Sequence, residues 1–260
     1  MATEAICTTV DAVTEGATAS IMCIEIDRPQ QKNALTQGMY QVLAESLESA
    51  AQQAHIRAVV LQGSSSVFTS GNDLADFMNG LDTSDPNNPI LRFMMALMDC
   101  PKPVVAAVAG HAVGIGTTLL QYCDLVYARY DAQLQMPFAK LALCPEFGAS
   151  YFLPKIVGHS RAKAWLLTGQ RIPAQEALHA GLVHHVVSDP IAEAHVAAQD
   201  LASLAPSALM QTKSLLNKDE MTKLKTVIYN EIAVFTEALK GEEFREAATA
   251  FFEKRAPQFS

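Results

Sequence analysis

The sequence predicts an α/β fold that ends in a helical part. Short apolar runs alternate with amphipathic segments over roughly the first two-thirds of the chain, which is typical of strands followed by helices. From Pro190 onward the pattern is helical. Half of the 260 residues are hydrophobic, so the chain can bury a large core. We expect an α/β core over residues 1–195 and a helical part over residues 196–260.

Strands are predicted where short apolar runs end at glycine, proline or polar loops. Residues 21–26 contain three isoleucines and stop before the polar loop 28–33. The run 58–61 ends at Gly63 and three serines. The predicted strands are residues 21–26, 58–61, 104–108, 125–128, 132–136 and 182–187.

Helices are predicted where apolar residues recur every three or four positions. Residues 81–89 are polar and hold two prolines, which predicts a surface loop. Thr36 is the expected N-cap of the first helix, whose apolar positions are Met39, Leu43, Leu47, Ala50 and Ala54. Two more helices are predicted directly after the turns at residues 68–74 and 110–116. The remaining predicted helices cover residues 90–98, 147–157, 161–167 and 174–180, and Gly181 is expected to end the last of these. C-terminal breaks are expected near Pro206, Asn217 and Gly241.

The charge of the chain excludes several classes of partner. There are 27 acidic residues against 19 lysines and arginines, for a net charge of -8. A surface that binds nucleic acid or an anionic membrane needs a basic face. We expect neither partner, although a small anionic ligand held by a few local cations remains compatible with this charge.

One uncharged run, residues 103–123, is long enough to resemble a membrane span. It contains Gly110, Gly114 and Gly116, which break the helical pattern. A soluble strand, a glycine turn and a buried helix explain the run better. The first 19 residues carry no recognisable secretory signal, so we expect a cytoplasmic protein.

Cysteine and histidine spacing predicts neither disulfides nor a metal site. The five cysteines are widely spaced, odd in number and never in a Cys-x-x-Cys pair, so buried free thiols are expected. His184 and His185 are adjacent in a predicted strand and would point to opposite faces. The cysteines are Cys7, Cys23, Cys100, Cys123 and Cys144.

Two glycine turns, each after an apolar strand, are candidate binding elements. They are residues 70–73 and 110–116. The second lacks the third glycine of a dinucleotide fingerprint, because Leu119 occupies that position. Helix starts at such turns present unpaired N–H groups, and two turns side by side could aim two of them at one oxygen. A purely structural role for both turns is the alternative.

Glu146 is the candidate general base. It lies among Cys144, Pro145 and Phe147 at the start of a predicted helix. Apolar neighbours raise the pKa of a carboxyl toward neutrality, which suits proton abstraction. The alternative is an ordinary glutamate of the first helical turn, favoured there by the helix dipole.

Several segments together resemble the enoyl-CoA hydratase/isomerase (crotonase) family in order and spacing. The resemblance covers nearly the whole chain, from about Ile21 to Phe252. The segments that carry it are residues 28–35, 58–63, 68–74, 101–116, 123–124 and 180–187.

This resemblance implies a crotonase-like superhelix of β-β-α turns with C-terminal helices that build a trimer or a dimer of trimers. It implies acyl-CoA thioester substrates, with coenzyme A as part of the substrate and no other cofactor. It also implies an oxyanion hole made by the backbone N–H groups of Asn72 and Ile115, whose side chains are expected to matter little.

Departures from the family pattern indicate the reaction. A typical hydratase carries two glutamates that hold and activate a water, and here those positions are Thr118 and Phe138. Glu146 matches the position of the single catalytic glutamate in the Δ3,Δ2-enoyl-CoA isomerase subgroup. The resemblance therefore implies an isomerase that moves a double bond from C3 to C2 of an enoyl-CoA, with Glu146 as acid and base.

The resemblance also places residues against coenzyme A. Lys32 matches a cation near the CoA phosphates, and Lys213 is a weaker candidate, although a solvated surface charge explains either lysine. The apolar helix 90–98 could line the acyl pocket or simply pack in the core. The substrate-binding residues implied are Lys32, Ser70, Gly71, Asn72, Asp73, Leu74, Gly114 and Ile115.

Three other functions remain open at this stage. One is an isomerase of a cyclic or aromatic-degradation CoA intermediate, which can use an acid at the position of Glu146. A second is a plain hydratase, disfavoured by Thr118 and Phe138. The third is an acyl-CoA-binding scaffold without turnover, disfavoured by the intact glycine turns and Glu146.

Overall fold

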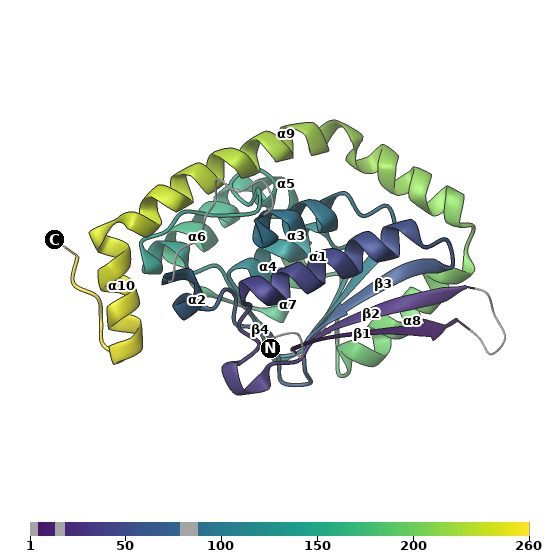
Figure 1. Ribbon diagram of the computed structural model, residues 1–260, viewed down its shortest axis with the longest axis horizontal. Helices are drawn as coiled ribbons and strands as arrows, with labels where there is room; N and C mark the ends of the chain where they lie inside the picture. The colour runs from purple at the N-terminus through teal and green to yellow at the C-terminus, as the bar shows by residue number, and fades with distance from the viewer. Residues whose placement is uncertain (1–4, 14–18, 79–87, 260) are drawn as a thin grey trace.

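The computed structural model describes residues 5–13, 19–78 and 88–259 and contains two sheets (Figure 1). The larger sheet has the strand order β1-β2-β3-β5-β7-β10, and the smaller one β4-β6-β8-β9. The strands are β1 (Ile6–Ala12), β2 (Ser20–Ile26), β3 (Ile56–Gln62), β4 (Val67–Thr69), β5 (Val104–Val108), β6 (His111–Val113), β7 (Leu125–Arg129), β8 (Gln133–Gln135), β9 (Arg171–Pro173) and β10 (His185–Val187).

Helices follow or connect these strands. The α-helices are α1 (Gln37–Gln52), α2 (Leu74–Met78), α3 (Pro89–Met98), α4 (Ile115–Thr118), α5 (Leu153–Val157), α6 (His159–Thr168), α7 (Ala174–Ala180), α8 (Pro190–Ser203), α9 (Pro206–Lys240) and α10 (Glu242–Glu253). Short 3-10 helices are η2 (Pro29–Gln31), η3 (Leu119–Tyr122) and η4 (Phe138–Leu141).

The chain alternates between the two sheets as it advances. β3, β5 and β7 are parallel neighbours in the larger sheet, and β4, β6 and β8 are parallel neighbours in the smaller one. Each of the strands β3, β5 and β7 is therefore followed along the chain by a strand of the smaller sheet. This is the repeated β-β-α turn expected from the sequence, and the α/β superhelix with helices at its C-terminal end is confirmed.

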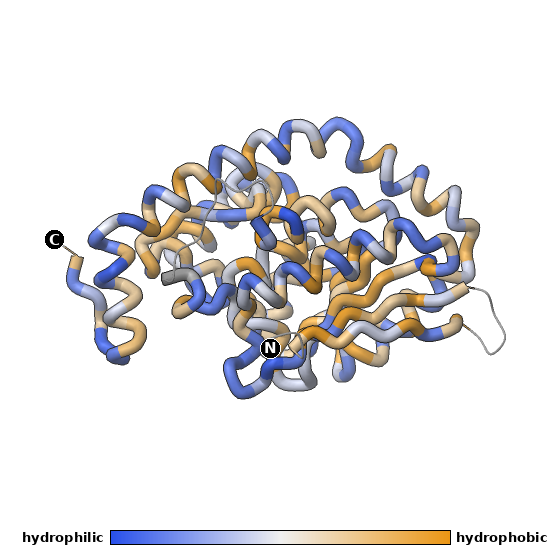
Figure 2. Tube along the Cα trace, in the orientation of Figure 1, coloured by the Kyte–Doolittle hydropathy of each residue, from blue (hydrophilic) through white to orange (hydrophobic). Residues whose placement is uncertain are grey.

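The central strands β2, β3 and β5 of the larger sheet are buried on both faces, which explains why they are almost continuously apolar (Figure 2). Alternate residues of one strand enter different cores: Val59 faces the main core and Val60 the second. The second core lies against α8, whose Ala194, Ala198 and Ala202 form a stripe of small residues. This stripe lets the helix approach the sheet closely.

Most longer elements agree with the sequence prediction. The Thr36 hydroxyl accepts a hydrogen bond from the Met39 N–H at 3.4 Å and caps α1, which ends two residues before Ala54. Gly181 ends α7 with a φ of 84°. The strands expected at 21–26, 58–61, 104–108, 125–128 and 132–136 are observed as β2, β3, β5, β7 and β8.

Several short strands were not predicted. β1 pairs antiparallel with β2 at the sheet edge, and all of its residues after Ile6 are exposed, so it has no apolar run to detect. β4 and β6 have three residues each; β4 overlaps the turn predicted at 68–74, and β6 lies inside the turn predicted at 110–116. The predicted loop 81–89 lies outside the described residues except for Asn88, which caps α3, and Pro89, which begins it.

Three boundaries in the second half of the sequence were predicted wrongly. The helix expected over 147–157 begins only at Leu153, because Phe147 and Gly148 adopt left-handed backbone conformations. The strand expected over 182–187 starts at His185. The expected break at Asn217 is absent, since α9 is continuous through it.

The uncharged run 103–123 divides into β5, β6, α4 and η3. Nowhere in residues 5–13, 19–78 and 88–259 is there a helix both long and apolar enough to traverse a bilayer. The prediction of buried thiols is wrong for Cys7, which is exposed, and for Cys144, which is half-buried. Cys23, Cys100 and Cys123 are buried.

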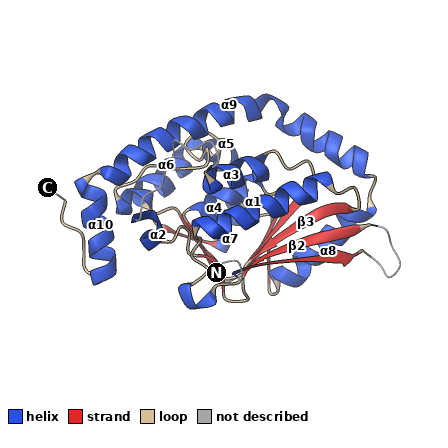
Figure 3. Ribbon diagram, in the orientation of Figure 1, coloured by secondary structure: helices blue, strands red, loops and turns tan. Residues whose placement is uncertain are grey.

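The long helix α9 arches over the top of the core and leads to α10 (Figure 3). Lys213 attaches its first half to the core, because its Nζ donates to Asp124 Oδ2 at 2.6 Å and to the Lys102 carbonyl at 2.9 Å. The predicted domain boundary at 195/196 falls inside α8 and stays a prediction. Large apolar side chains on the outer side of α9 are exposed at Leu215, Leu216, Tyr229 and Val234.

We predict that Gly110→Ala is far more destabilising than Gly181→Ala. Both glycines have a left-handed φ, 78° and 84°, but a Cβ at Gly110 would lie 1.9 Å from the Ser66 carbonyl oxygen. At Gly181 the nearest atom would be 3.8 Å away. The left-handed penalty alone is about 1–2 kcal/mol, and the backbone clash should bring the loss at Gly110 above about 4 kcal/mol. Equal losses of unfolding free energy for the two variants, measured by urea unfolding, would contradict this steric argument.

Candidate active site

Parallel pairing of β4 with β6 brings the two glycine turns to one edge of the smaller sheet. The turns touch: a Cβ on Gly71 would lie 2.7 Å from the Val113 carbonyl oxygen, and one on Gly116 would lie 2.4 Å from Thr69 Cγ2. Only glycine allows this approach at both positions. Gly71 also has a φ of 87° and Gly114 one of 58°. The side-by-side arrangement expected from the sequence is therefore present.

Next to these glycines, two backbone N–H groups have no protein acceptor. Across the described segments, neither the Asn72 N–H nor the Ile115 N–H donates a hydrogen bond to a protein oxygen. Ile115 is the first residue of α4, where an N–H has no acceptor within the helix. Asn72 follows Gly71, whose own N–H donates to Thr69 Oγ1 at 3.0 Å. Two free donors on touching turns can stabilise a negative oxygen placed between them.

Glu146 lies in the loop between η4 and α5, and no helix begins there. The alternative that Glu146 is a glutamate of a first helical turn is therefore wrong. Its side chain is only 5% exposed. The next two residues, Phe147 with a φ of 56° and Gly148 with a φ of 71°, form a left-handed turn. This turn reverses the chain just after Glu146 and leaves the carboxyl group inside the protein.

The Asn72 side chain connects the two turns to Glu146. Tyr40, fully buried on α1, donates its hydroxyl hydrogen bond to Asn72 Oδ1. The Asn72 amide group is thereby oriented with its N–H side free, and hydrogen bonding from Asn72 lowers the pKa of the Glu146 carboxyl group. Within residues 5–13, 19–78 and 88–259, the carboxylate oxygen Oε1 of Glu146 has no hydrogen-bond partner. The expectation that the Asn72 side chain matters little overlooked these two contacts.

The surroundings of Glu146 favour its protonated form. Burial, followed by the nearby negative charge of Glu231, raises the pKa of Glu146 from 4.5 to about 8, and the hydrogen bond from Asn72 opposes this rise. A carboxyl group with a pKa near neutrality can both accept and return a proton. The site therefore combines two backbone N–H groups that have no acceptor in the described segments with one carboxyl group of raised pKa.

The sequence analysis did not identify two residues of this site, Tyr40 and Glu231. Tyr40 lies on the buried face of α1, where an aromatic residue is typical of the core. Glu231 carried a usable signal: on α9 the buried residues are Leu224, Ile228, Glu231 and Phe235, at spacings of four, three and four. A glutamate on a buried helical stripe indicates a structural or functional partner.

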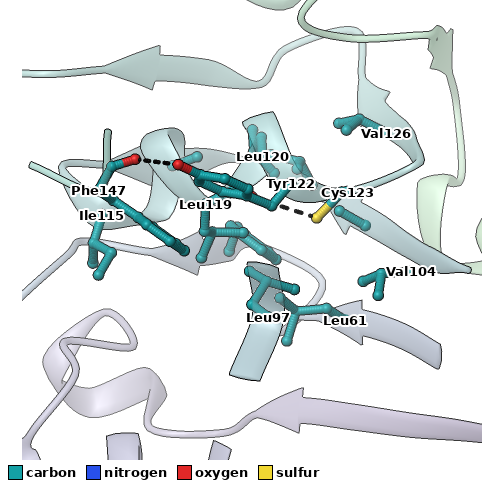
Figure 4. Packing of buried hydrophobic residues seen from close by; sticks show 14 of the residues in the cluster. Leu61, Leu97, Val104, Ile115, Leu119, Leu120, Tyr122, Cys123, Val126 and Phe147 are labelled. Carbon is teal, nitrogen blue, oxygen red and sulfur yellow. Dashed lines mark hydrogen bonds between the residues drawn. The ribbon is translucent and has the colours of Figure 1, made fainter. Parts of the chain in front are cut away.

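The helix α3, expected either to line the acyl pocket or to pack in the core, contributes Phe93 to the buried surroundings of Glu146. The Phe93 ring lies 5.4 Å from the Tyr40 ring and 6.3 Å from the Phe147 ring. Tyr122 stacks on Phe147 at 4.2 Å and donates its hydroxyl to the Phe147 carbonyl at 2.7 Å (Figure 4). Aromatic rings thus pack on both sides of the turn that follows Glu146.

The predicted CoA-binding residues are gathered near the first turn. The Lys32 carbonyl accepts from the Ser70 N–H at 3.0 Å, so the exposed Lys32 lies beside this turn. Asp73 is paired with Arg28 at 2.7 Å and its Oδ1 accepts from the N–H of Asp76 in α2, the helix that begins at Leu74. Lys213 is paired with Asp124 instead, which leaves it a structural contact.

The positions of the two missing hydratase glutamates are both buried. Thr118 ends α4, and its hydroxyl donates to the Ile115 carbonyl at 3.4 Å. Phe138 begins η4 and is in the main core. Among the residues that the structure describes, no group of three or more His, Cys, Asp or Glu is placed to hold a metal ion.

Comparison with known proteins gives the family. Residues 16–260 match the model of the enoyl-CoA hydratase/isomerase family, and the chain belongs to that family. The chain is 34% identical over 240 residues to peroxisomal enoyl-CoA delta isomerase 3 of Mus musculus, covering 90% of this chain and 75% of that protein. It is 32% identical over 253 residues to 1,2-epoxyphenylacetyl-CoA isomerase of Escherichia coli K12, covering 92% and 95%.

A solved structure agrees with the fold. The crystal structure of an enoyl-CoA hydratase/isomerase from Pseudoalteromonas atlantica T6c aligns with a TM-score of 0.91 at 37% identity, over 99% of this chain and all of that chain. The crotonase resemblance drawn from the motifs is therefore confirmed. Membership implies an enzyme that acts on acyl-CoA thioesters, and the family includes both hydratases and isomerases.

The raised pKa of Glu146 predicts how pH affects stability. Between pH 4.5 and about 8 the folded protein holds a proton that the unfolded chain releases, so this group's contribution to stability falls as pH rises. The variant Glu146→Gln lacks this pH-dependent loss of stability, because its side chain does not titrate. Its free energy of unfolding relative to wild type should increase across this window by up to about 1.4 kcal/mol per pH unit. A difference that stays constant from pH 4.5 to 8 in urea unfolding would contradict the buried, proton-holding state.

Proposed function

We propose that this protein is an acyl-CoA isomerase that moves a double bond from C3 to C2 of an enoyl-CoA thioester. The observation that carries the proposal is the single buried carboxyl group of Glu146 beside the free N–H groups of Asn72 and Ile115. Adding water requires a second group to activate it, and the positions where hydratases carry glutamates are Thr118 and Phe138. Isomerisation adds no water and needs one acid–base group on one face of the substrate.

In this reaction the thioester oxygen accepts hydrogen bonds from the two backbone N–H groups. The unprotonated Glu146 removes a proton from C2: the C2–H bond breaks, its electron pair forms a C1–C2 double bond, and negative charge moves onto the thioester oxygen. Donors fixed at that oxygen stabilise this dienolate more than the substrate, by on the order of 3 kcal/mol per donor. Glu146 then returns the proton to C4, where the electron pair of the C3–C4 double bond forms the new C–H bond. The C1–C2 pair moves between C2 and C3, and the negative oxygen re-forms the thioester carbonyl.

The unpartnered Oε1 of Glu146 is the atom suited to this proton transfer. Asn72 acts on the same carboxyl group and lowers its pKa, so it favours the ionised form that accepts the proton. Tyr40 in turn holds Asn72, so the base is oriented by a chain of two hydrogen bonds that begins on α1.

We predict that Glu146→Gln lowers kcat for a 3-enoyl-CoA by about 100-fold to 10,000-fold. Acyl-CoA affinity should change little, because Gln has nearly the same shape and the oxyanion donors belong to other residues. A matched control is Glu193→Gln on the exposed face of α8, which should retain full activity. Full activity of Glu146→Gln would place the base elsewhere.

We predict that kcat/KM rises with pH and levels off above about 8. Glu146 must lose its proton before it can accept one from C2, and its pKa in the free protein is raised to about 8. Initial rates from pH 6 to 9.5 with a straight-chain 3-enoyl-CoA measure the rising part of this pH profile. A profile that is flat through this range would contradict Glu146 as the titrating base.

The second candidate function is isomerisation of a ring-derived CoA thioester. It is supported by the similarity to the E. coli protein named 1,2-epoxyphenylacetyl-CoA isomerase. Parallel assays with a straight-chain 3-enoyl-CoA, a 2-enoyl-CoA and a cyclic CoA thioester separate the two isomerases from a hydratase. Binding of all three without product would instead indicate a scaffold without turnover.

Binding of coenzyme A and assembly are part of the same proposal. Lys32 is exposed beside the first turn, which suits contact with a phosphate of CoA. The exposed apolar residues of α9, such as Leu215 and Leu216, support assembly of trimers or dimers of trimers through the C-terminal helices. A cytoplasmic location remains part of the proposal.

A further inference from the structure

We propose that Glu231, on the C-terminal helix α9, is a positioning residue for the reaction: it holds the turn that follows Glu146 and so directs the free Oε1 of Glu146 into the site. This inference rests on the proposed role of Glu146 as the base. It concerns a residue about 85 positions away along the chain, on an element that contributes no other group to the site described above.

Glu231 is buried where a charged residue is costly. It is 8% exposed and shares the buried stripe of α9 with Leu224, Ile228 and Phe235. An ionised carboxylate in such surroundings is retained only when hydrogen bonds compensate its lost hydration. No ion pair to Glu231 is found in the described part of the chain.

The compensating donors all come from the turn after Glu146. Gly148 N–H donates to Glu231 Oε2 at 2.6 Å, and Ser150 donates to Oε1 through its N–H at 2.9 Å and its hydroxyl at 2.5 Å. Burial raises the pKa of Glu231, and the hydrogen bonds from Ser150 and Gly148 oppose this rise by favouring the ionised carboxylate. Both oxygens are engaged, which leaves the side chain one orientation.

The turn depends on this acceptor. Phe147 and Gly148 have consecutive left-handed φ angles, and the conformation is unfavourable for phenylalanine. It also points the Gly148 and Ser150 N–H groups toward α9, where without Glu231 they would lose their acceptor. The helix packs directly on the turn, since a Cβ on Gly148 would lie 2.8 Å from Leu224 Cδ2.

The charge of Glu231 acts on Glu146 as well. The side chains around the two carboxyl groups are uncharged: Tyr40 and Asn72 face Glu146, and Tyr122, Cys144 and Ser150 face Glu231. The Glu231 charge contributes to the raised pKa of Tyr122, and it helps raise the pKa of Cys144 to about 11. Among the described residues no cation is paired with Glu231, so its charge adds to burial in raising the pKa of Glu146.

The test is Glu231→Gln, which keeps the shape of the side chain and removes its charge. We expect kcat to fall at least about tenfold with KM within about threefold, because the base is misdirected while CoA contacts remain. We expect the pH midpoint of Glu146 to move down by about one unit. A merely structural role would lower the melting temperature and leave the midpoint in place.

Two further variants complete the design. Ser150→Ala removes one donor and keeps the Glu231 charge, so kcat should fall about threefold with an unchanged midpoint. This variant tests the positioning role if Glu231→Gln does not fold. Glu237→Gln changes an exposed glutamate on the same helix and should alter neither quantity.

Protonation of Glu146 is measured directly by infrared titration of its carboxyl band, identified by its loss in Glu146→Gln. This readout needs no turnover, so it separates the two proposals. Full activity of Glu146→Gln overturns the proposed function, whatever the titration shows. The role of Glu231 is overturned if a folded Glu231→Gln variant keeps both the wild-type Glu146 midpoint and the wild-type kcat. If Glu231→Gln does not fold, an unchanged kcat in Ser150→Ala overturns it.

Discussion

The site depends on the burial of two carboxyl groups with no cation beside them in the described structure. Glu231 accepts hydrogen bonds from the turn that directly follows Glu146, although 84 residues separate the two glutamates along the sequence. Neutral donors hold both: the Asn72 amide at Glu146, and the 148–150 turn at Glu231. Because unpaired buried charge is costly, these donors must stay in place for the surrounding loops to remain folded. Burial, followed by the charge of Glu231, keeps the proton affinity of Glu146 high.

The two-sheet superhelix provides the rigid frame for this arrangement. Parallel strands of the smaller sheet end at one edge, where the turns at Gly71 and Gly114 touch. Glu146 reaches that edge from the loop after η4, and α9 closes over the loop. Chemistry at the site therefore draws on three distant parts of the chain. An insertion or shift in any one of them would separate the donors from the base.

Much of the candidate site could be predicted from the sequence. The glycine turns and Glu146 carry local signals, namely apolar strands that end at glycine and an acid set among apolar residues. Tyr40 and Glu231 carry no motif, since each is recognised only by its partner across the fold. The left-handed turn at Phe147 was missed for the same reason: an unfavourable φ is tolerated because α9 and Tyr122 fix it from outside.

The sequence by itself determined the α/β class, the longer strands and helices, the family and the type of residue available for proton transfer. These follow from periodicity and short motifs, which are local properties. Tertiary structure alone decided that β4 and β6 are strands, that α9 runs unbroken, and which oxygen of Glu146 is free. It also decided the pKa of Glu146, because burial and the charge of Glu231 arise only when distant segments pack together.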